Sequence, residues 1–185
     1  MNEFPFLHSC ASSLAPYRIA FDAKRAYHNT TGLGHYSRTL IQSLATYYPQ
    51  HNYYLFNPKP SSKFNFHAFS NTYEVQPNSV FYKYLPLLWR SSGIKKDLKK
   101  LSIALYHGLS HEIPIGIQRT NIRSIVTIHD LIFERYPKQL GYIDAHIHHL
   151  KAKNACIHAN KIIAARKQKK KDIVDFYSIL PNKIE

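Results

Sequence analysis

Cysteine is almost absent from this sequence, with only Cys10 and Cys156 among 185 residues. Two isolated cysteines cannot build a disulfide framework or a cysteine-based zinc site, so a reducing compartment is the simplest expectation. Long apolar runs are also missing, and none approaches the roughly 20 residues of a membrane-spanning helix. Segment 1–16 lacks the basic start and the continuous apolar core of a secretory signal peptide. These absences predict a cytoplasmic protein without a membrane-spanning helix.

Acidic residues are scarce, because 11 Asp and Glu stand against 25 Lys and Arg, which gives a formal net charge of +14. Such a field attracts anionic partners, including nucleotide phosphates, acidic lipid head groups and nucleic acid. The apolar and aromatic contents, 44% and 14%, are those of a folded globule rather than of a disordered tail. The length allows one well-buried domain. We therefore expect a poorly ordered extension at 1–16 and a single domain at 17–185.

Strand-like and helix-like segments alternate along the chain. Strands are expected at 17–22, 52–56, 103–106, 125–128 and 161–165. Helices are expected at 34–48, 85–101, 139–158 and 169–177, and the segment 23–34 is expected to be a polar loop. The apolar face of the helix 139–158 is expected to carry Leu140, Ile143, Ile147, Leu150 and Ile157. The alternation predicts an α/β fold, with a Rossmann-like parallel sheet and helices on both faces.

Segment 124–131 contains the most strand-like run of the chain, and the run ends in His129 and Asp130. Its β-branched and apolar residues are typical of a strand buried on both faces of a parallel sheet. Ligands of open α/β sheets bind just outside the carboxyl ends of the strands. His129 and Asp130 are therefore candidate site residues by position, although a histidine at a strand end is about as often a satisfied structural residue.

Two glycines, Gly32 and Gly34, lie between the first expected strand and the first expected helix. Glycines let the backbone approach a ligand closely, and the free N–H groups of a helix start favour a phosphate. However, Ser37 stands where the dinucleotide-binding fingerprint has its third glycine, and no Walker-type lysine follows. The pattern is compatible both with a phosphate-binding loop and with a plain tight turn.

A second group of titratable residues follows the strand 103–106. His107, His111 and Glu112 are expected at the same edge of the sheet as His129, and His107 and Glu112 are candidates for binding substrate. Histidines and carboxylates that meet can hold a metal ion, but this spacing defines no ligand set, so no metal site is predicted. The alternative is a metal-dependent hydrolase that uses His107, His111 and His129.

Basic residues accumulate between Lys151 and Lys171, where no acidic residue occurs. Such a run is usually a solvated face, but it also attracts an anionic membrane, at about 1 kcal/mol per basic residue near the surface. A peripheral position at the inner face of the cytoplasmic membrane is therefore an expectation. No nucleic-acid-binding module is visible, so no specific nucleic acid is expected as a partner. A non-enzymatic basic module that binds anionic membranes or nucleic acid stands as the alternative function.

Three segments occur in order along the chain: IAFDAKRAYHNTTGLGHYSRTLI from Ile19, YHGLSHEIP from Tyr106 and VTIHDLIFERYP from Val126. Together they resemble the N-terminal half of family 4 glycosyltransferases, above all bacterial enzymes that build surface polysaccharide, over 17–185. The resemblance implies a two-domain GT-B enzyme that transfers a sugar from a nucleotide-diphosphate donor with retention of configuration. In that family the N-terminal Rossmann-like domain mostly binds the acceptor, and the C-terminal domain binds the donor nucleotide.

The resemblance also implies roles for individual residues. Gly32 and Gly34 match a glycine-rich loop that faces the donor phosphates, and His129 matches a histidine that lines the cleft near the transferred sugar, with Asp130 beside it. Such enzymes generally need no metal and no cofactor besides the nucleotide-sugar donor. The resemblance implies a glycan or a lipid-linked molecule as the acceptor.

The sequence departs from that family in two places. Segment 165–171 is basic where the family usually has a serine-rich turn, so the following helix is expected to lack a hydroxyl cap and about 1 kcal/mol of stabilisation. The chain also ends where the linker and the donor domain are expected. The sequence therefore predicts the acceptor-side domain of a truncated glycosyltransferase, which transfers no sugar alone because the nucleotide sugar binds to the missing C-terminal domain.

Overall fold

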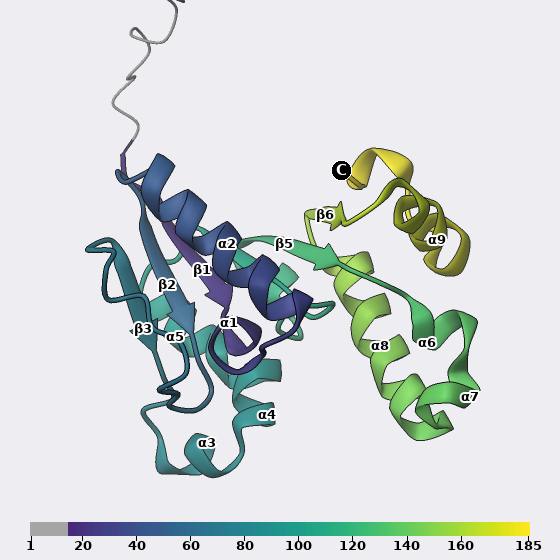
Figure 1. Ribbon diagram of the computed structural model, residues 1–185, viewed down its shortest axis with the longest axis horizontal. Coiled ribbons are helices and arrows are strands. Elements are labelled where there is room, and N and C mark those ends of the chain that lie inside the picture. Colours follow the sequence, from purple (N-terminus) through teal and green to yellow (C-terminus); the bar gives the residue numbers. More distant parts are fainter. Residues whose placement is uncertain (1–14) are drawn as a thin grey trace, which may run out of the picture.

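A six-stranded, all-parallel sheet forms the centre of the computed structural model, which describes residues 15–185 apart from the side chain of Leu140 (Figure 1). The strand order is β3-β2-β1-β4-β5-β6. The strands are β1 (Arg18–Asp22), β2 (Asn52–Phe56), β3 (Thr72–Val75), β4 (Leu105–Gly108), β5 (Arg123–Ile128) and β6 (Lys161–Ala164). The predicted Rossmann-like α/β fold is confirmed. The extension expected at 1–16 falls almost wholly outside the described residues.

α-Helices lie between β1 and β2, between β3 and β4, and between β5 and β6, while a segment without a helix joins β2 to β3 and a 3-10 turn lies between β4 and β5 (Figure 1). The helices are α1 (Lys24–His28), α2 (Gly32–Tyr47), α3 (Val80–Tyr84), α4 (Pro86–Leu88), α5 (Ile94–Lys100), α6 (Ile132–Arg135), α7 (Pro137–Leu140), α8 (Tyr142–His158) and α9 (Lys167–Tyr177), with a π-helical turn η1 (Trp89–Gly93) and 3-10 turns η2 (Ile117–Arg119) and η3 (Pro181–Lys183). No helix in residues 15–185 is both long enough and apolar enough to cross a membrane.

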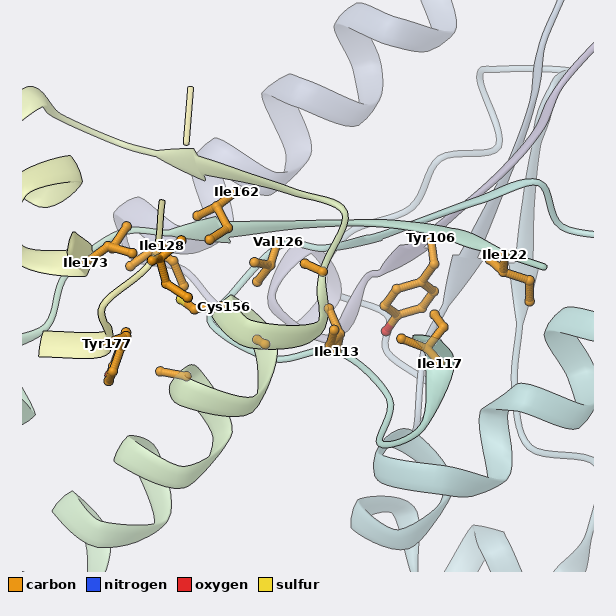
Figure 2. Close-up of a cluster of buried hydrophobic side chains, with 14 of the residues drawn as sticks. Tyr106, Ile113, Ile117, Ile122, Val126, Ile128, Cys156, Ile162, Ile173 and Tyr177 are labelled. Carbon is orange, nitrogen blue, oxygen red and sulfur yellow. The ribbon is translucent and has the colours of Figure 1, made fainter. Parts of the chain in front are cut away.

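Two hydrophobic cores lie on the two faces of the sheet, because neighbouring residues of a strand point in opposite directions. Phe21 and Leu55 are register partners of β1 and β2, and both belong to the core that α1 and α2 cover. Ala20 belongs to the other core, with Val126 of β5 and Ala152 of α8. Figure 2 shows this second core, in which Val126, Ile128 and Ile162 lie over Cys156 of α8. Helices thus cover both faces, as expected.

The predicted apolar face of the helix 139–158 is wrong. Ile143 is 79% exposed, and Ile147, Leu150 and Ile157 are also exposed, while the side chain of Leu140 lies outside the described residues. The buried residues of α8 are Ala145, Ala152, Ala155 and Cys156. Small side chains let a helix approach a sheet closely. The face of α8 that carries alanines therefore packs against the sheet, and the face with larger apolar residues is exposed.

Three segments differ locally from expectation. The polar loop at 23–34 contains α1, and the helix expected at 85–101 is interrupted by η1. Strand β3 lies in the segment 61–84, which has no clear apolar periodicity. Its residues are exposed or half-buried because it is an edge strand that pairs only with β2, so its sequence lacks the apolar alternation of the inner strands.

Candidate functional site

His129 stands directly after β5, at the carboxyl edge of the sheet. Its Nε2 lies 2.9 Å from the carbonyl oxygen of Leu109, and this nitrogen must donate because a carbonyl only accepts. The ring of Tyr36 from α2 packs edge-on against the imidazole, with 4.7 Å between ring centroids. In the neutral ring the proton therefore sits on Nε2, and Nδ1 is then an acceptor with no hydrogen-bond partner among residues 15–185.

His111 holds the backbone next to this imidazole. Its Nε2 accepts hydrogen bonds from the amides of His129 and Asp130, at 2.9 and 3.3 Å. Burial lowers the pKa of His111 to about 4, so the ring is neutral at pH 7 with its proton on Nδ1. The residue has a φ of 61°, a left-handed conformation that non-glycine residues rarely adopt. The fold thus uses His111 to shape the turn that presents His129.

His107 lies inside β4 rather than after it, and its side chain is only 5% exposed. Its Nε2 is 2.8 Å from Oγ1 of Thr127, which is also 3.4 Å from the hydroxyl of Tyr36. Burial, followed by repulsion from His129, lowers the pKa of His107 to about 4. The structure therefore places His107 in the interior, holding Thr127, and not at the surface where a substrate was expected to meet it.

The three histidines do not converge as a metal site. Within residues 15–185 no group of three or more His, Cys, Asp and Glu side chains could hold a metal ion. The Nε2 atoms of His107, His111 and His129 are each engaged, with Thr127, two backbone amides and the Leu109 carbonyl respectively. The metal-dependent hydrolase therefore lacks its proposed ligand set.

A buried ion cluster occupies the same edge of the sheet, around Arg90 of η1. The Arg90 guanidinium donates to Asp22 at the end of β1, with Nη2 2.5 Å from Oδ2, and also to Glu112. Lys151 of α8 pairs with Glu112 at 2.9 Å. Although burial alone would raise it, Arg90 and Lys151 hold the pKa of Glu112 below its ordinary value. The predicted site residue Glu112 therefore ties η1 to α8.

Sequence reasoning missed Asp22, Arg90 and Tyr36. The signal for Asp22 was available, because it ends a strand in the same way as His129 does. Arg90 gave no signal, since its partners Asp22 and Glu112 are 68 and 22 residues away in sequence. Tyr36 lies within a helix that was expected, but the sequence did not indicate that its ring contacts His129 or that its hydroxyl reaches Thr127.

The two glycines have different environments. Gly32 starts α2 and is exposed, and a Cβ there would meet no atom within 4 Å. Gly34 is buried, and a Cβ there would lie 1.8 Å from the carbonyl oxygen of Asn29. The Asn29 side chain also accepts from the amides of Thr31 and Gly34, at 2.8 and 3.1 Å. Gly34 therefore serves close packing, while the amides of Gly32 and Leu33 have no partner within the described part of the chain.

Asp130 makes a hydrogen bond within the protein. Asp130 is half-buried, and its Oδ1 accepts from the amide of Ile132 at 3.4 Å.

Four lysines of the basic run have partners within the protein. Lys151 pairs with Glu112, and Lys161 pairs with Glu185. Lys169 pairs with Asp172, and Lys170 donates to the carbonyl oxygen of Ile184. The other basic residues of the run, Lys153, Arg166, Lys167 and Lys171, are exposed. Arg166 is the N-cap residue of α9 and makes no side-chain cap hydrogen bond, as expected from the missing hydroxyls.

The buried histidines predict a stability loss in mild acid. The folded state keeps His107 neutral down to about pH 4, whereas the unfolded chain protonates near pH 6.5, so stability is full above pH 6.5 and falls as the pH drops. Between pH 7.5 and 5 we expect His107 to contribute a loss of about 2 kcal/mol, measured by urea unfolding. His107→Gln keeps a donor for Thr127 and should lose about 2 kcal/mol less over that interval. An identical pH dependence in both proteins would contradict this assignment.

No protein-family model matches the chain, and no curated protein matches its sequence. Among solved structures, the chain is similar to a glycosyltransferase from Rickettsia africae ESF-5, with 13% sequence identity and a TM-score of 0.46. The similarity covers 93% of this chain and 42% of that chain. This chain therefore spans less than half the length of that protein, and at this identity the likeness concerns the fold alone.

Proposed function

We propose that this chain is the acceptor-side domain of a retaining glycosyltransferase, which moves a sugar from a nucleotide-diphosphate donor to a glycan or lipid-linked acceptor. The observation that carries the proposal is the His129 imidazole at the carboxyl edge of β5, held in one tautomer with a free Nδ1. This is the edge where open α/β sheets bind ligands. The resemblance of the three sequence segments to family 4 enzymes supplies the reaction class.

The arrangement supports one role for His129 and another for the amides of Gly32 and Leu33. The free Nδ1 of His129 can accept a hydrogen bond from a sugar hydroxyl, and Tyr36 and His111 limit the movement of the ring. Tyr36 also places the first turns of α2 beside His129, and the open amides of Gly32 and Leu33 begin that helix. Amides at a helix start favour phosphate oxygens. In the proposed reaction, these amides stabilise the departing nucleotide diphosphate while His129 orients the sugar.

His129→Ala tests the proposal once a nucleotide-sugar-binding domain is joined to the C-terminus, so that transfer can be measured. The variant should lower kcat about 10²–10³-fold, because one preorganised contact to the reacting sugar is removed. It should also lose about 1–3 kcal/mol of stability, because the Leu109 carbonyl loses its donor. Turnover per folded molecule and urea unfolding, measured on the same preparation, separate the two effects.

His146→Ala is the matched control, because His146 is an exposed histidine of α8 whose ring contacts His149 and not His129. It should leave both transfer and stability unchanged. Normal turnover per folded molecule in His129→Ala, accompanied by the stability loss, would assign His129 a structural role and remove the observation that carries the proposal.

A peripheral position at an anionic membrane is a second part of the proposal. Lys153 is exposed on α8 beside the exposed Ile157 and Leu150, so basic and apolar groups share one surface. Such surfaces bind anionic membranes by charge and by apolar burial. The engagement of Lys151 and Lys161 within the protein reduces the charge available to a purely basic module, which makes the alternative function weaker. No nucleic-acid partner is proposed.

A further inference from the structure

A small pocket opens beside the ion cluster, between α1, the segment after β2, and α4. Its volume is about 320 Å³, and its lining includes Lys24, Lys59, Pro86, Leu87 and Arg90. No acidic side chain lines it. His28, at its rim, donates from Nε2 to Asn57 Oδ1 at 2.9 Å, so this ring is already fixed by the protein. The charged groups that face the pocket are therefore cations.

The cations exceed the carboxylates around this pocket. Asp22 and Glu112 lie near Lys24, but Arg90 pairs with both carboxylates, and Lys151 pairs with Glu112 as well. The Nζ of Lys24, a half-buried residue, has no acceptor among residues 15–185, and the same holds for Lys59. Burial, and then repulsion from Arg90, lowers the pKa of Lys24. An anion in the pocket would relieve this repulsion.

Arg90 adds an organised donor to the pocket. Its side chain is 9% exposed, and its Nε and Nη2 atoms hold Asp22 and Glu112. Its Nη1 has no acceptor in the described part of the chain. Because the two carboxylates fix the guanidinium, Nη1 can bind a phosphate oxygen with little further loss of side-chain freedom.

An apolar surface continues from the mouth of the pocket. Leu87 lines the pocket and is 63% exposed. Further exposed apolar side chains lie in α3, in α4 and between the two helices: Val80, Phe81, Tyr84, Leu85 and Leu88. In Figure 1, α3 and α4 lie on the side toward which the arrows of β1 and β2 point, so this surface belongs to the carboxyl edge. Exposed apolar side chains gathered on one short segment in this way indicate a binding site.

We infer that this pocket binds the phosphate of an amphiphilic acceptor, whose hydrocarbon chain lies on the α3–α4 surface. The inference rests on the proposed function and selects a lipid phosphate over a free glycan as the acceptor. Lys24, Lys59 and Arg90 supply the charge for the phosphate, and Leu87 joins the pocket to the apolar surface. A soluble phosphate ester would use the same cations but would gain nothing from Leu87.

Calorimetric titration of the purified chain with decyl phosphate, below its micelle concentration, tests the inference. Decyl phosphate should bind saturably, and inorganic phosphate should bind much more weakly. Lys24→Met should weaken decyl phosphate binding about tenfold by removing a charge-assisted hydrogen bond. Leu87→Ser should weaken it about tenfold by removing apolar contact, and should leave inorganic phosphate binding unchanged.

Two variants elsewhere serve as matched controls, and circular dichroism verifies that all four variants are folded. Lys96→Met removes an exposed lysine of α5, and Leu180→Ser removes an exposed leucine between α9 and η3. Both should bind decyl phosphate like the unmodified protein. Equal weakening by the controls, or binding of uncharged decyl glucoside as tight as that of decyl phosphate, would overturn the inference. Inorganic phosphate that binds as tightly as decyl phosphate would overturn it in favour of a soluble phosphate.

Sugar transfer plays no part in this titration, so the two proposals fail separately. An inactive fused enzyme with normal decyl phosphate binding would refute the proposed function and leave an amphiphile-binding pocket. An active enzyme whose chain does not bind decyl phosphate would refute the pocket and leave the proposed function.

Discussion

Replacing Arg90 with methionine is expected to destabilise the protein by about 3–5 kcal/mol, because it leaves two carboxylates of a buried cluster without their shared partner. Asp22 is 3% exposed and would lose both of its hydrogen bonds from Arg90, keeping only the one from the Lys24 amide. Glu112 would keep only Lys151. Methionine fills a similar volume, so the loss reports the unpaired charges rather than a cavity. Urea unfolding at pH 7 measures the change in the free energy of unfolding.

Two further variants make the assignment to charge testable. Arg119→Met removes an exposed arginine of η2 and should change stability by less than about 0.5 kcal/mol. Adding Asp22→Asn to Arg90→Met removes one unpaired charge, so the double variant should be more stable than Arg90→Met alone. Asp22→Asn alone gives the reference for this comparison. If Asp22→Asn lowers the free energy of unfolding by the same amount in the unmodified protein and in Arg90→Met, the two side chains are not coupled and the explanation is wrong.

Gly34→Ala is expected to destabilise the protein by about 3 kcal/mol or more, whereas Gly32→Ala is tolerated. The Cβ of residue 34 would lie 1.8 Å from the Asn29 carbonyl oxygen, and that oxygen is held by Nη1 of Arg38 at 2.8 Å. The backbone must shift and break this bond, a cost at or above the usual range for overpacking. At residue 32 a Cβ meets nothing within 4 Å, so stability should stay constant or rise by up to about 1 kcal/mol.

Urea unfolding of both alanine variants at neutral pH gives the comparison, since each change adds one methyl group to the same helix. Equal losses would show that the steric contact at Asn29 does not control the start of α2. The two variants also distinguish a packing role from a ligand-binding role. Gly34 is buried and its amide is bonded to Asn29, whereas Gly32 is exposed and its amide has no partner within residues 15–185.

The inner strands were predictable because their signal is local. Segment 124–131 is β-branched and apolar whatever surrounds it, and β5 covers residues within that run. Strand β3 was not predictable in this way, since an exposed edge strand takes its conformation from pairing with β2. The face of α8 was predicted wrongly because periodicity identifies apolar positions but not the distance between helix and sheet. That distance favours Ala152 and Ala155 over Ile143 and Leu150.

The candidate site was also predictable only in part. Position after a strand identified His129 and Asp130, because parallel strands place their carboxyl ends at one edge. It could not show that His107 is buried or that Glu112 is paired with Arg90. It also could not show that His111 holds the backbone of the turn that carries His129. Those facts depend on contacts between residues about 20 positions apart. The pocket beside Arg90 likewise requires α1, α4 and η1 to be assembled.

By itself, the sequence determined the class of the fold, the positions of the inner strands and the edge of the sheet at which chemistry is expected. These properties follow from short-range patterns of apolar, β-branched and turn-forming residues. Only the tertiary structure decided which polar groups remain available to a ligand, because hydrogen bonds and ion pairs between distant segments engage most of them. The Nζ of Lys24 and the Nδ1 of His129 have no hydrogen-bond partner within residues 15–185, whereas His107, Glu112 and half of the basic run are engaged by the protein.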